Sequence, residues 1–269
     1  MKQLPIGIFD SGIGGLNVAH AIKKELPYEN IIYFGDTKHL PYGEKSAELI
    51  NKFSRIIAEF LINKKCKAII IACNSASSVA LETIKIVAGK IPVFNVIDPV
   101  INYISKSYKN ININIGVIGT KATIQSGIYE KKIKNLNKKI IVSSLQTPLL
   151  APMIEEGFFN ESISKTITDK YLSHERLKNI KCLILACTHY PLIQEEINNY
   201  YRFRNPYRRE VNVIDSAKII AKHVSENIHH KNNINIPEYK FYVSNYTKSF
   251  EESAKLFFKE DIKLQEVNI

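Results

Sequence analysis

The stretch KAIIIACNSASSVAL, residues 67–81, decides the fold class of the chain. We predict a strand at Lys67–Ala72, and every residue of it after Lys67 is apolar. Such an uninterrupted apolar run is typical of a strand buried on both faces of a sheet. The residues from Ser75 to Ala88 then predict a helix. A strand that is apolar on both faces and leads into a helix indicates a parallel sheet covered by helices.

The same alternation of strands and helices extends in both directions from this stretch. On its N-terminal side we predict strands at Ile6–Phe9 and Ile31–Phe34 and helices at Gly14–Leu26 and Ser46–Asn63. Near the C-terminus we predict helices at Ala217–Asn227 and Phe250–Phe258 and a strand at Lys240–Val243. The fold class is therefore α/β.

Four strand motifs return in the same order later in the chain. PIGIFDSG (5–12) is echoed by NIGVIGTK (114–121), NIIYF (30–34) by KIIVS (139–143), IIIACNS (69–75) by LILACTH (183–189), and FNVIDP (94–99) by VNVIDS (211–216). The offsets are 109, 109, 114 and 117 residues. This regular spacing predicts two similar α/β halves with parallel-sheet cores related by a pseudo-twofold axis, with seams near Asp98 and Asp215.

Cys73 and Cys187 occupy equivalent places in the two halves, each directly after an apolar strand. Ligands of parallel sheets bind beyond the carboxyl ends of the strands. Halves that face each other across a pseudo-twofold axis would bring the two thiols into one cavity from opposite sides. One thiolate would then remove a proton from one face of a carbon, and the opposite thiol would deliver a proton to the other face. Both cysteines stand just before a predicted helix, whose N-terminus favours a thiolate.

Five segments of the chain closely resemble the glutamate racemases, a cofactor-independent family that supplies D-glutamate for peptidoglycan. They are IFDSGIGGL (8–16), FGDTKHLPYG (34–43), ACNSASSVAL (72–81), VIGTKATIQSGIY (117–129) and ACTHYPLI (186–193). The resemblance runs from about Ile6 to Asp215, with its segments in order.

The resemblance implies a role for particular residues of this chain. It gives the two proton transfers to Cys73 and Cys187, with Cys73 acting on D-glutamate and Cys187 on L-glutamate. The residues that assist the thiols are Asp10 and His189, and the further acidic positions around the site are Asp36 and Glu155. The residues that hold the substrate are Asp10, Ser11, Tyr42, Gly43, Asn74, Ser75, Thr120, Thr188 and His189.

The resemblance also implies an overall organisation. The C-terminal segment is expected to return to the first half, which gives one domain of residues 1–97 plus 215–269 and a second of residues 98–214. The active site is expected in the cleft between them, without cofactor or metal. We also expect a homodimer, because dimers are common in the family.

The chain departs from the family pattern at two positions. Ser75 stands where Thr is more frequent, which keeps a hydroxyl group. Asp98 stands where Glu is more frequent, which puts a role for that carboxylate in doubt.

Each singled-out residue also has a structural interpretation. Asp10 is placed to be a helix N-cap, and His189 to be a capping or packing residue. Cys187 and His189 are metal ligand types, although no complementary ligand cluster is evident. Asp36 and Glu155 could be surface acids without a role in the site. We expect Cys66 and Cys182 to be inert thiols that only pack in the core.

Composition limits the classes of protein and partner. The 269 residues carry a formal net charge of +11, from 37 Lys and Arg against 26 Asp and Glu. Lysine is spread along the whole chain, so we do not expect a nucleic-acid partner. No apolar run approaches ~20 residues, which argues against a membrane span. The N-terminal MKQLPIGIFD lacks the apolar core of a signal peptide, so we expect a cytoplasmic protein with free thiols.

Two other functions remain open at this point. Aspartate racemisation uses a related fold and a similar cysteine pair, and one methylene of side-chain length is a small basis for discrimination. A binding or regulatory role is the other, because some glutamate racemases restrain DNA gyrase and YYRFRNPYRR (200–209) holds four of the six arginines. We expect that stretch to be a basic surface loop, and we do not expect gyrase binding as the main role.

Overall fold

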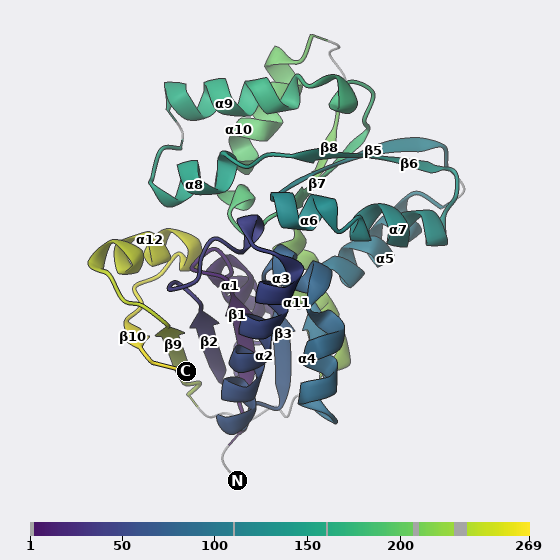
Figure 1. Ribbon diagram of the computed structural model, residues 1–269. Helices are drawn as coiled ribbons and strands as arrows, with labels where there is room; N and C mark the ends of the chain where they lie inside the picture. Colours follow the sequence, from purple (N-terminus) through teal and green to yellow (C-terminus); the bar gives the residue numbers. More distant parts are fainter. Residues whose placement is uncertain (1–2, 110, 160, 207–209, 229–235) are drawn as a thin grey trace. The chain divides into compact units, whose positions relative to one another are not determined.

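The computed structural model of the chain describes residues 3–109, 111–159, 161–206, 210–228 and 236–269 (Figure 1). Contacts within the chain divide it into two compact units. Unit 1 comprises residues 1–99 and 217–269, and unit 2 comprises residues 100–216.

Unit 1 is built on a parallel six-stranded sheet with the strand order β10-β9-β2-β1-β3-β4. Ile8 at the centre lies opposite Tyr33 on one side and Ile70 on the other, and all three are fully buried. The strands are β1 (Ile6–Asp10), β2 (Ile31–Gly35), β3 (Ala68–Ile71), β4 (Val93–Asn95), β9 (Tyr239–Val243) and β10 (Leu264–Glu266).

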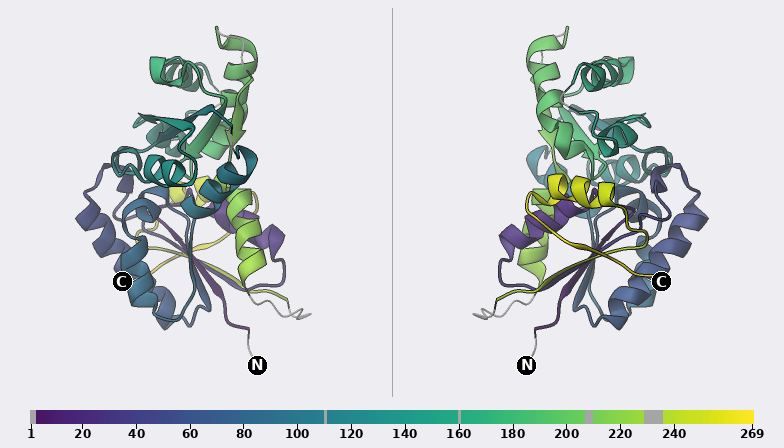
Figure 2. Two further views of the ribbon diagram at one scale, coloured as in Figure 1. Left: turned by 90° about the vertical axis from the view of Figure 1, so that its right-hand side faces the viewer. Right: turned by 90° about the vertical axis from the view of Figure 1, so that its left-hand side faces the viewer.

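Helices cover both faces of this sheet, because its strands are apolar on both faces. Helices α1 and α11 lie on one face, and α2 and α4 lie on the other (Figure 2). The helices of unit 1 are α1 (Leu16–Glu25), α2 (Ala47–Asn63), α3 (Asn74–Val79), α4 (Leu81–Ala88), α11 (Ser216–Asn227) and α12 (Lys248–Phe258), with a 3-10 turn η1 (Tyr42–Glu44). The first residue of α11, Ser216, is counted with unit 2.

The prediction of one continuous helix over residues 75–88 is wrong. The structure has two helices there, α3 and α4, which meet at Ala80. The backbone of Ala80, with φ −108° and ψ 0°, departs from helical geometry at that residue. A run of small polar residues gives no local signal for such a break, and α3 also begins earlier than predicted, at Asn74.

Unit 2 contains a parallel four-stranded sheet with the order β6-β5-β7-β8. Helices α6 and α7 lie on one face and α9 and α10 on the other (Figure 1). The strands are β5 (Ile113–Gly119), β6 (Ile140–Gln146), β7 (Cys182–Ala186) and β8 (Asn212–Ile214). The helices and turns are α5 (Ile97–Ser107, from Val100), α6 (Lys121–Gln125), α7 (Ile128–Leu136), α8 (Leu150–Glu155), α9 (Ser162–Leu172), η2 (Glu175–Leu177), η3 (Tyr190–Ile193), α10 (Gln194–Asn199) and η4 (Tyr200–Arg204).

The two sheets share one strand order, which confirms the prediction of two parallel-sheet α/β halves. The order β2-β1-β3-β4 of unit 1 corresponds strand for strand to β6-β5-β7-β8 of unit 2. Equivalent glycines meet equivalent neighbours. A Cβ atom on Gly7 of β1 would lie 2.9 Å from the sulfur of Cys66, and one on Gly116 of β5 would lie 2.8 Å from Ile180. Cys66 precedes β3 and Ile180 precedes β7, which are the strands paired with β1 and β5 in the two sheets. Each half therefore imposes the same steric demand for glycine.

The C-terminal segment adds two strands to the sheet of unit 1. Phe241 of β9 lies opposite Tyr33 of β2, and β10 pairs with β9. Helix α12 packs on α1, where the rings of His20 and Phe258 lie 5.7 Å apart. Among the described residues, no helix combines the length and apolarity needed to span a bilayer.

Candidate active site

Cys73 lies at the carboxyl end of β3, in the N-cap position of α3. The amide of Ala76 donates a hydrogen bond to its sulfur at 3.4 Å, and its thiol lies 3.7 Å from the hydroxyl of Ser11. The residue is buried, with an exposed fraction of 4%. A backbone amide that points at the sulfur stabilises negative charge there, as the sequence predicted for a thiol at the start of a helix.

Asp10 ends β1 beside this cysteine-bearing loop and is fully buried. Its Oδ2 accepts a hydrogen bond from the amide of Gly12 at 3.1 Å, whereas the N-cap of α1 is Gly15. The helix-capping interpretation of Asp10 is therefore wrong. A Cβ atom on Gly15 would lie 2.5 Å from the Cβ of Asp10, so glycine is required for the helix to start this close to the carboxylate.

Tyr33 is a buried residue of this region that sequence reasoning missed. Its hydroxyl donates to the carbonyl of Gly12 at 2.8 Å and so anchors the loop that carries Asp10 and Ser11. Burial and the charges of Asp10 and Cys73 hold the pKa of Tyr33 well above its usual value, so it keeps the proton that it donates. Because Tyr33 is one aromatic residue within an apolar strand, no local pattern separates it from core packing.

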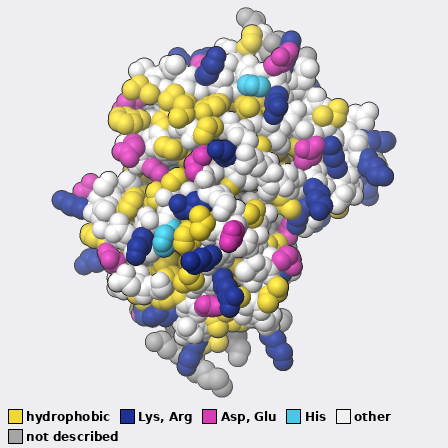
Figure 3. All heavy atoms as spheres, in the orientation of Figure 1, with side chains coloured by type: hydrophobic (Ala, Val, Ile, Leu, Met, Phe, Trp, Pro, Cys, Tyr) yellow, Lys and Arg dark blue, Asp and Glu magenta, His cyan; other side chains and the backbone are white. Residues whose placement is uncertain are grey.

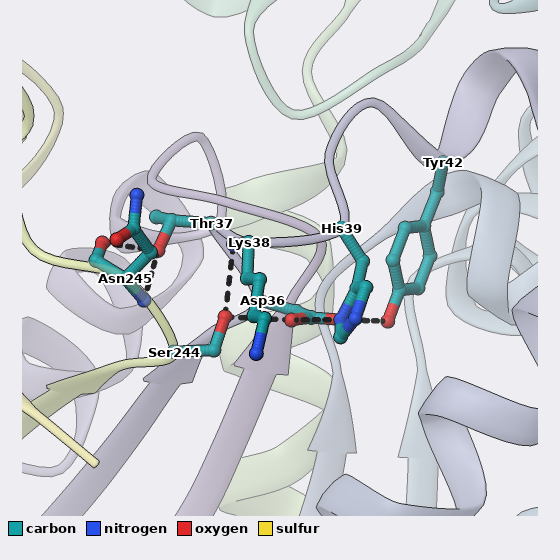
Figure 4. A network of polar contacts seen from close by, with 7 residues as sticks. All are labelled: Asp36, Thr37, Lys38, His39, Tyr42, Ser244 and Asn245. Carbon is teal, nitrogen blue, oxygen red and sulfur yellow. Dashed lines mark hydrogen bonds and ion pairs between the residues drawn. The ribbon is translucent and has the colours of Figure 1, made fainter. Parts of the chain in front are cut away.

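Asp36 follows β2 and lies at the centre of a polar network (Figure 4). Its carboxylate contacts the hydroxyl of Tyr42 at 2.6 Å, the hydroxyl of Ser244 at 2.7 Å and Nδ1 of His39 at 2.9 Å. Asp36 is 2% exposed, so its interpretation as a surface acid is wrong. Burial and the neighbouring Asp36 raise the pKa of Tyr42, which acts as a hydroxyl donor.

The expected residues of unit 1 gather at one edge of its sheet. The loops after β1, β2 and β3 are joined there by backbone hydrogen bonds, from the amide of Asp36 to the carbonyl of Asp10 and from the amide of Ala72 to the carbonyl of Phe9. These strands are neighbours in a parallel sheet, so their carboxyl ends meet. The residues on or beside these loops are Asp10, Ser11, Asp36, Tyr42, Gly43, Cys73, Asn74 and Ser75.

Cys187 in unit 2 follows β7, and its sulfur lies 3.6 Å from Nδ1 of His189. The other ring nitrogen of His189 forms an ion pair with Glu155 of α8, with 2.8 Å between Nε2 and Oε1. His189 is buried, and the side chain of Glu155 is 19% exposed. His189 occupies the N-cap position of η3, but its side chain makes no cap and instead contacts Cys187 and Glu155. The interpretation of Glu155 as a surface acid without a role is wrong, since its carboxylate is paired in this Cys–His–Glu arrangement.

The charges of this group support one another. Burial alone would lower the pKa of His189, but the carboxylate of Glu155 and the sulfur of Cys187 raise it well above its usual value. Burial alone would raise the pKa of Glu155, but His189 brings it below its usual value. At neutral pH the arrangement is a carboxylate and an imidazolium, with the imidazolium next to the sulfur.

Cys187 lies just before a helical turn, as predicted, but unlike Cys73 it does not cap that turn with its sulfur. The 3-10 turn η3 begins only at Tyr190, and Cys187 contributes its carbonyl to the amide of Tyr190 rather than its sulfur to a helix start. Pro191 near the start of η3 fits the first turn of a helix, where a backbone N–H is not needed. The sequence Thr-His-Tyr-Pro therefore inserts one extra turn between the cysteine and the helical segment.

The remaining expected residues of unit 2 lie near these groups in the fold. Thr120 follows β5 and caps α6 by accepting a hydrogen bond from the amide of Thr123 at 3.4 Å, and Thr188 is buried between Cys187 and His189. Tyr190, which sequence reasoning missed, is fully buried and its hydroxyl lies 2.7 Å from that of Thr147.

Cys66 and Cys182 behave as packing residues. Both are free thiols with exposed fractions of 3% and 0%, and burial raises the pKa of each to about 12. They therefore remain protonated at neutral pH. Within the described ranges of the chain, no group of three or more His, Cys, Asp or Glu side chains is placed to hold a metal ion.

The prediction of a surface loop for the arginine-rich stretch is wrong over Tyr200–Arg204, which form the π-helical turn η4 with Tyr200 and Tyr201 buried. Arg204 forms a bidentate pair with Asp169 of α9, with Nε–Oδ2 and Nη2–Oδ1 distances of 2.9 and 2.8 Å. Arg202 lies over the ring of Phe203, 5.7 Å from its centre, while Arg208 and Arg209 fall outside the described residues. Figure 3 shows Lys and Arg dispersed over one face of the molecule among acidic and neutral side chains.

Comparison with known proteins decides the family. The sequence pattern described as Asp/Glu/Hydantoin racemase matches residues 16–224, which is most of the chain. The chain belongs to this racemase family. It is accordingly an isomerase of the amino-acid racemase class.

Relatives of the racemase family match the chain over nearly its full length. Glutamate racemase 3 of Caldanaerobacter subterraneus is 38% identical, covering 100% of this chain and 96% of the relative. The glutamate racemase of Enterococcus faecalis is 39% identical, with 100% and 97% covered. The crystal structure of the Francisella tularensis glutamate racemase in complex with D-glutamate has a TM-score of 0.89 and 38% identity, with 100% and 98% covered.

Proposed function

We propose that this racemase interconverts L- and D-glutamate without a cofactor, using Cys73 and Cys187 as two bases. The observation that carries the proposal is the placement of the two thiols at equivalent strand ends of a repeated fold, each among polar side chains. The glutamate racemases among its relatives, one of them in complex with D-glutamate, support the choice of substrate.

The reaction transfers one proton off the α-carbon and one proton onto it. One cysteine thiolate takes the α-proton and becomes a thiol, and the C–H electron pair remains on the α-carbon. The opposite cysteine thiol gives its proton to the other face of that carbon and becomes a thiolate. Following the resemblance, Cys187 starts the reaction from L-glutamate and Cys73 starts it from D-glutamate.

The ion pair of unit 2 assists Cys187 in this scheme. The imidazolium of His189 lies 3.6 Å from the sulfur, where its positive charge faces the atom that exchanges the proton. Glu155 keeps His189 charged by raising its pKa. In unit 1, the amide of Ala76 and the hydroxyl of Ser11 meet the sulfur of Cys73, and the buried carboxylate of Asp10 lies on the neighbouring strand end.

The substrate is a zwitterion with an additional carboxylate, which needs hydrogen-bond donors. Hydroxyl and amide side chains and loop amides of both units supply groups of this type. We assign substrate binding to Asp10, Ser11, Tyr42, Gly43, Asn74, Ser75, Thr120, Thr188 and His189.

The biological setting is part of the same proposal. D-glutamate made by this chain would enter peptidoglycan biosynthesis in the cytoplasm. The chain would act as a homodimer, and each protomer would have one domain of residues 1–97 plus 215–269 and another of residues 98–214. The four free, buried cysteines accord with a reducing compartment. Rescue of a D-glutamate auxotroph tests the pathway, and light scattering of the purified protein tests the dimer.

A chirality-resolved assay tests the activity itself. Purified protein treated with a chelator is incubated with L- or D-glutamate in D2O without added cofactor. We expect each enantiomer to yield the other with deuterium at the α-carbon. Absence of interconversion would overturn the proposal. The same assay is run with L- and D-aspartate, and faster racemisation of aspartate would identify aspartate rather than glutamate as the substrate.

A further inference from the structure

Two segments of unit 1 that are far apart in sequence, residues 36–42 and Ser244, meet at the carboxylate of Asp36 (Figure 4). Tyr42 comes from the turn η1, His39 from the loop before it, and Ser244 from the end of β9, 208 residues away in the chain. The hydroxyl of Ser244 donates to Oδ1 of Asp36 at 2.7 Å and accepts from the amide of Lys38 at 2.9 Å. Ser244 thus links both the side chain and the loop backbone to the C-terminal segment.

A second pair of contacts fixes the same junction. The amide of Asn245 donates to Oγ1 of Thr37 at 2.9 Å, and the amide of Ser244 donates to the carbonyl of Gly35 at 3.1 Å. The loop after β2 is therefore tied to the end of β9 along successive residues. This junction positions the backbone on which Asp36 stands.

The other side of the network is fixed by packing. The ring of His39 stacks on Phe53 of α2, with centres 4.0 Å apart and planes 12° apart. Tyr42 lies against the same Phe53, with ring centres 6.0 Å apart. Stacking orients His39 so that its Nδ1 faces Asp36.

Asp36 itself is arranged to hold neighbouring groups. Its two carboxylate oxygens contact Tyr42, Ser244 and His39, and the residue is 2% exposed. A carboxylate that accepts hydrogen bonds at both oxygens is held in one orientation and holds its donors in turn.

We propose that Ser244 is a positioning residue of the racemase site: through Asp36 it fixes the hydroxyl of Tyr42 and thereby the turn Tyr42–Gly43 that binds substrate. His39 completes the same network from the side of α2. Asp36 acts on the turn by accepting the hydrogen bond of Tyr42. The substrate part of this inference rests on the proposed function, whereas the link between Ser244 and the turn stands on the contacts alone.

The test compares two hydroxyl residues of the C-terminal segment. Ser244→Ala removes the contact with Asp36, and Ser244→Thr keeps a hydroxyl there. Thr247→Ala is the matched control, because Thr247 caps α12 through the amide of Phe250 and so contributes to the stability of the same segment. Each variant is examined for glutamate kinetics, thermal stability and amide hydrogen exchange of residues 38–46.

We expect Ser244→Ala to raise KM for glutamate roughly fivefold to tenfold with little change in kcat, and to speed hydrogen exchange of residues 38–46. Ser244→Thr should restore both properties. Thr247→Ala should lower Tm while leaving KM and the exchange of residues 38–46 unchanged. In a double variant with Tyr42→Phe, loss of the Ser244 hydroxyl should add little to KM, because both substitutions break one path.

The outcomes separate this inference from the proposed function. A wild-type protein that does not racemise glutamate overturns the proposed function, and the exchange measurement still decides the link between Ser244 and the turn. Unchanged exchange in Ser244→Ala overturns that link. An unchanged KM, an equal rise in KM in Thr247→Ala, or additive effects with Tyr42→Phe overturn the positioning role.

Discussion

The two cysteines stand at equivalent strand ends but in different electrostatic surroundings. The sulfur of Cys73 is met by the amide of Ala76 and the hydroxyl of Ser11, whereas the sulfur of Cys187 is met by the ring of His189, which is paired with Glu155. Amides and hydroxyls keep their character over the physiological pH range, but an imidazolium titrates. The two units therefore place a thiol at the same strand end but surround its sulfur with different groups.

The largest expected effect comes from removing either thiol. Cys73→Ser and Cys187→Ser should each reduce racemisation by about 10²–10⁴-fold, because a serine hydroxyl is a far weaker base than a thiolate. N-hydroxyglutamate reports on each base separately: after loss of the α-proton it expels water, and the resulting imine hydrolyses to 2-oxoglutarate and ammonia. Cys73→Ser should retain elimination from the L-enantiomer and Cys187→Ser from the D-enantiomer.

Cys66→Ala is the control for this experiment, because Cys66 is a buried thiol of the packing type. It should lose about 1 kcal/mol of stability and keep its racemase activity. Undiminished elimination from both enantiomers in either serine variant would show that one base serves both faces of the carbon, and the two-base scheme would fail.

Glu155→Gln tests whether the charge on His189 assists Cys187. Without the carboxylate, burial lowers the pKa of His189, so the imidazolium is lost at a lower pH than in the wild type. Elimination from the L-enantiomer should fall about 10–100-fold near pH 8, with the alkaline limb of its pH profile shifted to lower pH. Glu156→Gln, a change at the exposed neighbour, should leave the profile unchanged. If the pH profiles of Glu155→Gln and Glu156→Gln were equal, the ion pair would have no role in the mechanism.

Ser11→Ala is the corresponding change on the side of Cys73. Its hydroxyl contacts the sulfur at 3.7 Å, and losing it should reduce elimination from the D-enantiomer roughly fivefold to tenfold. Because a hydroxyl does not titrate in this range, the loss should be the same at pH 6.5 and pH 8.5. A loss that depends on pH would contradict the contrast drawn between the two thiols.

The ion pair should also affect stability within a defined pH window. The raised pKa of His189 stabilises the fold in full below its ordinary value of 6.5, and this contribution is lost as pH rises through the raised pKa. The lowered pKa of Glu155 stabilises the fold above its ordinary value of 4.5, and this contribution is lost as pH falls through the lowered pKa. Glu155→Gln should therefore cost most between these values, about 2 kcal/mol.

Urea unfolding of the wild type and of Glu155→Gln across this pH range measures the difference. A destabilisation that stays constant from pH 4 to pH 9 would show that Glu155 contributes through packing alone. Glu156→Gln again serves as the control, with a difference near zero throughout.

The sequence predicted the sheets better than it predicted the contacts at their edges. Buried parallel strands are apolar for their whole length, so β3 and β7 and the repeat that relates them are visible in the residue pattern. The break at Ala80 was missed, because small polar residues fit several turn geometries equally well. Boundaries of this kind are decided by packing.

Side-chain partners were the least predictable part of the candidate site. Resemblance placed Glu155 and His189 near the site, but the ion pair between residues 34 positions apart comes from the packing of α8 against η3. Ser244 and Tyr33 carried no signal at all, since one is a serine after a strand and the other an aromatic residue within one. Their roles are visible only once Asp36 and Gly12 are placed beside them.

The pairing of β9 with β2 determines the order in which the molecule is completed during synthesis. Unit 2 is one uninterrupted stretch of chain, so all of its strands are available once residue 216 has left the ribosome. Unit 1 must wait with one edge of β2 unpaired until residues 239–243 are made. Domains generally fold as units, the N-terminal one first during synthesis. Here the unit that contains the N-terminus is finished last, because the strand that closes it is near the C-terminus.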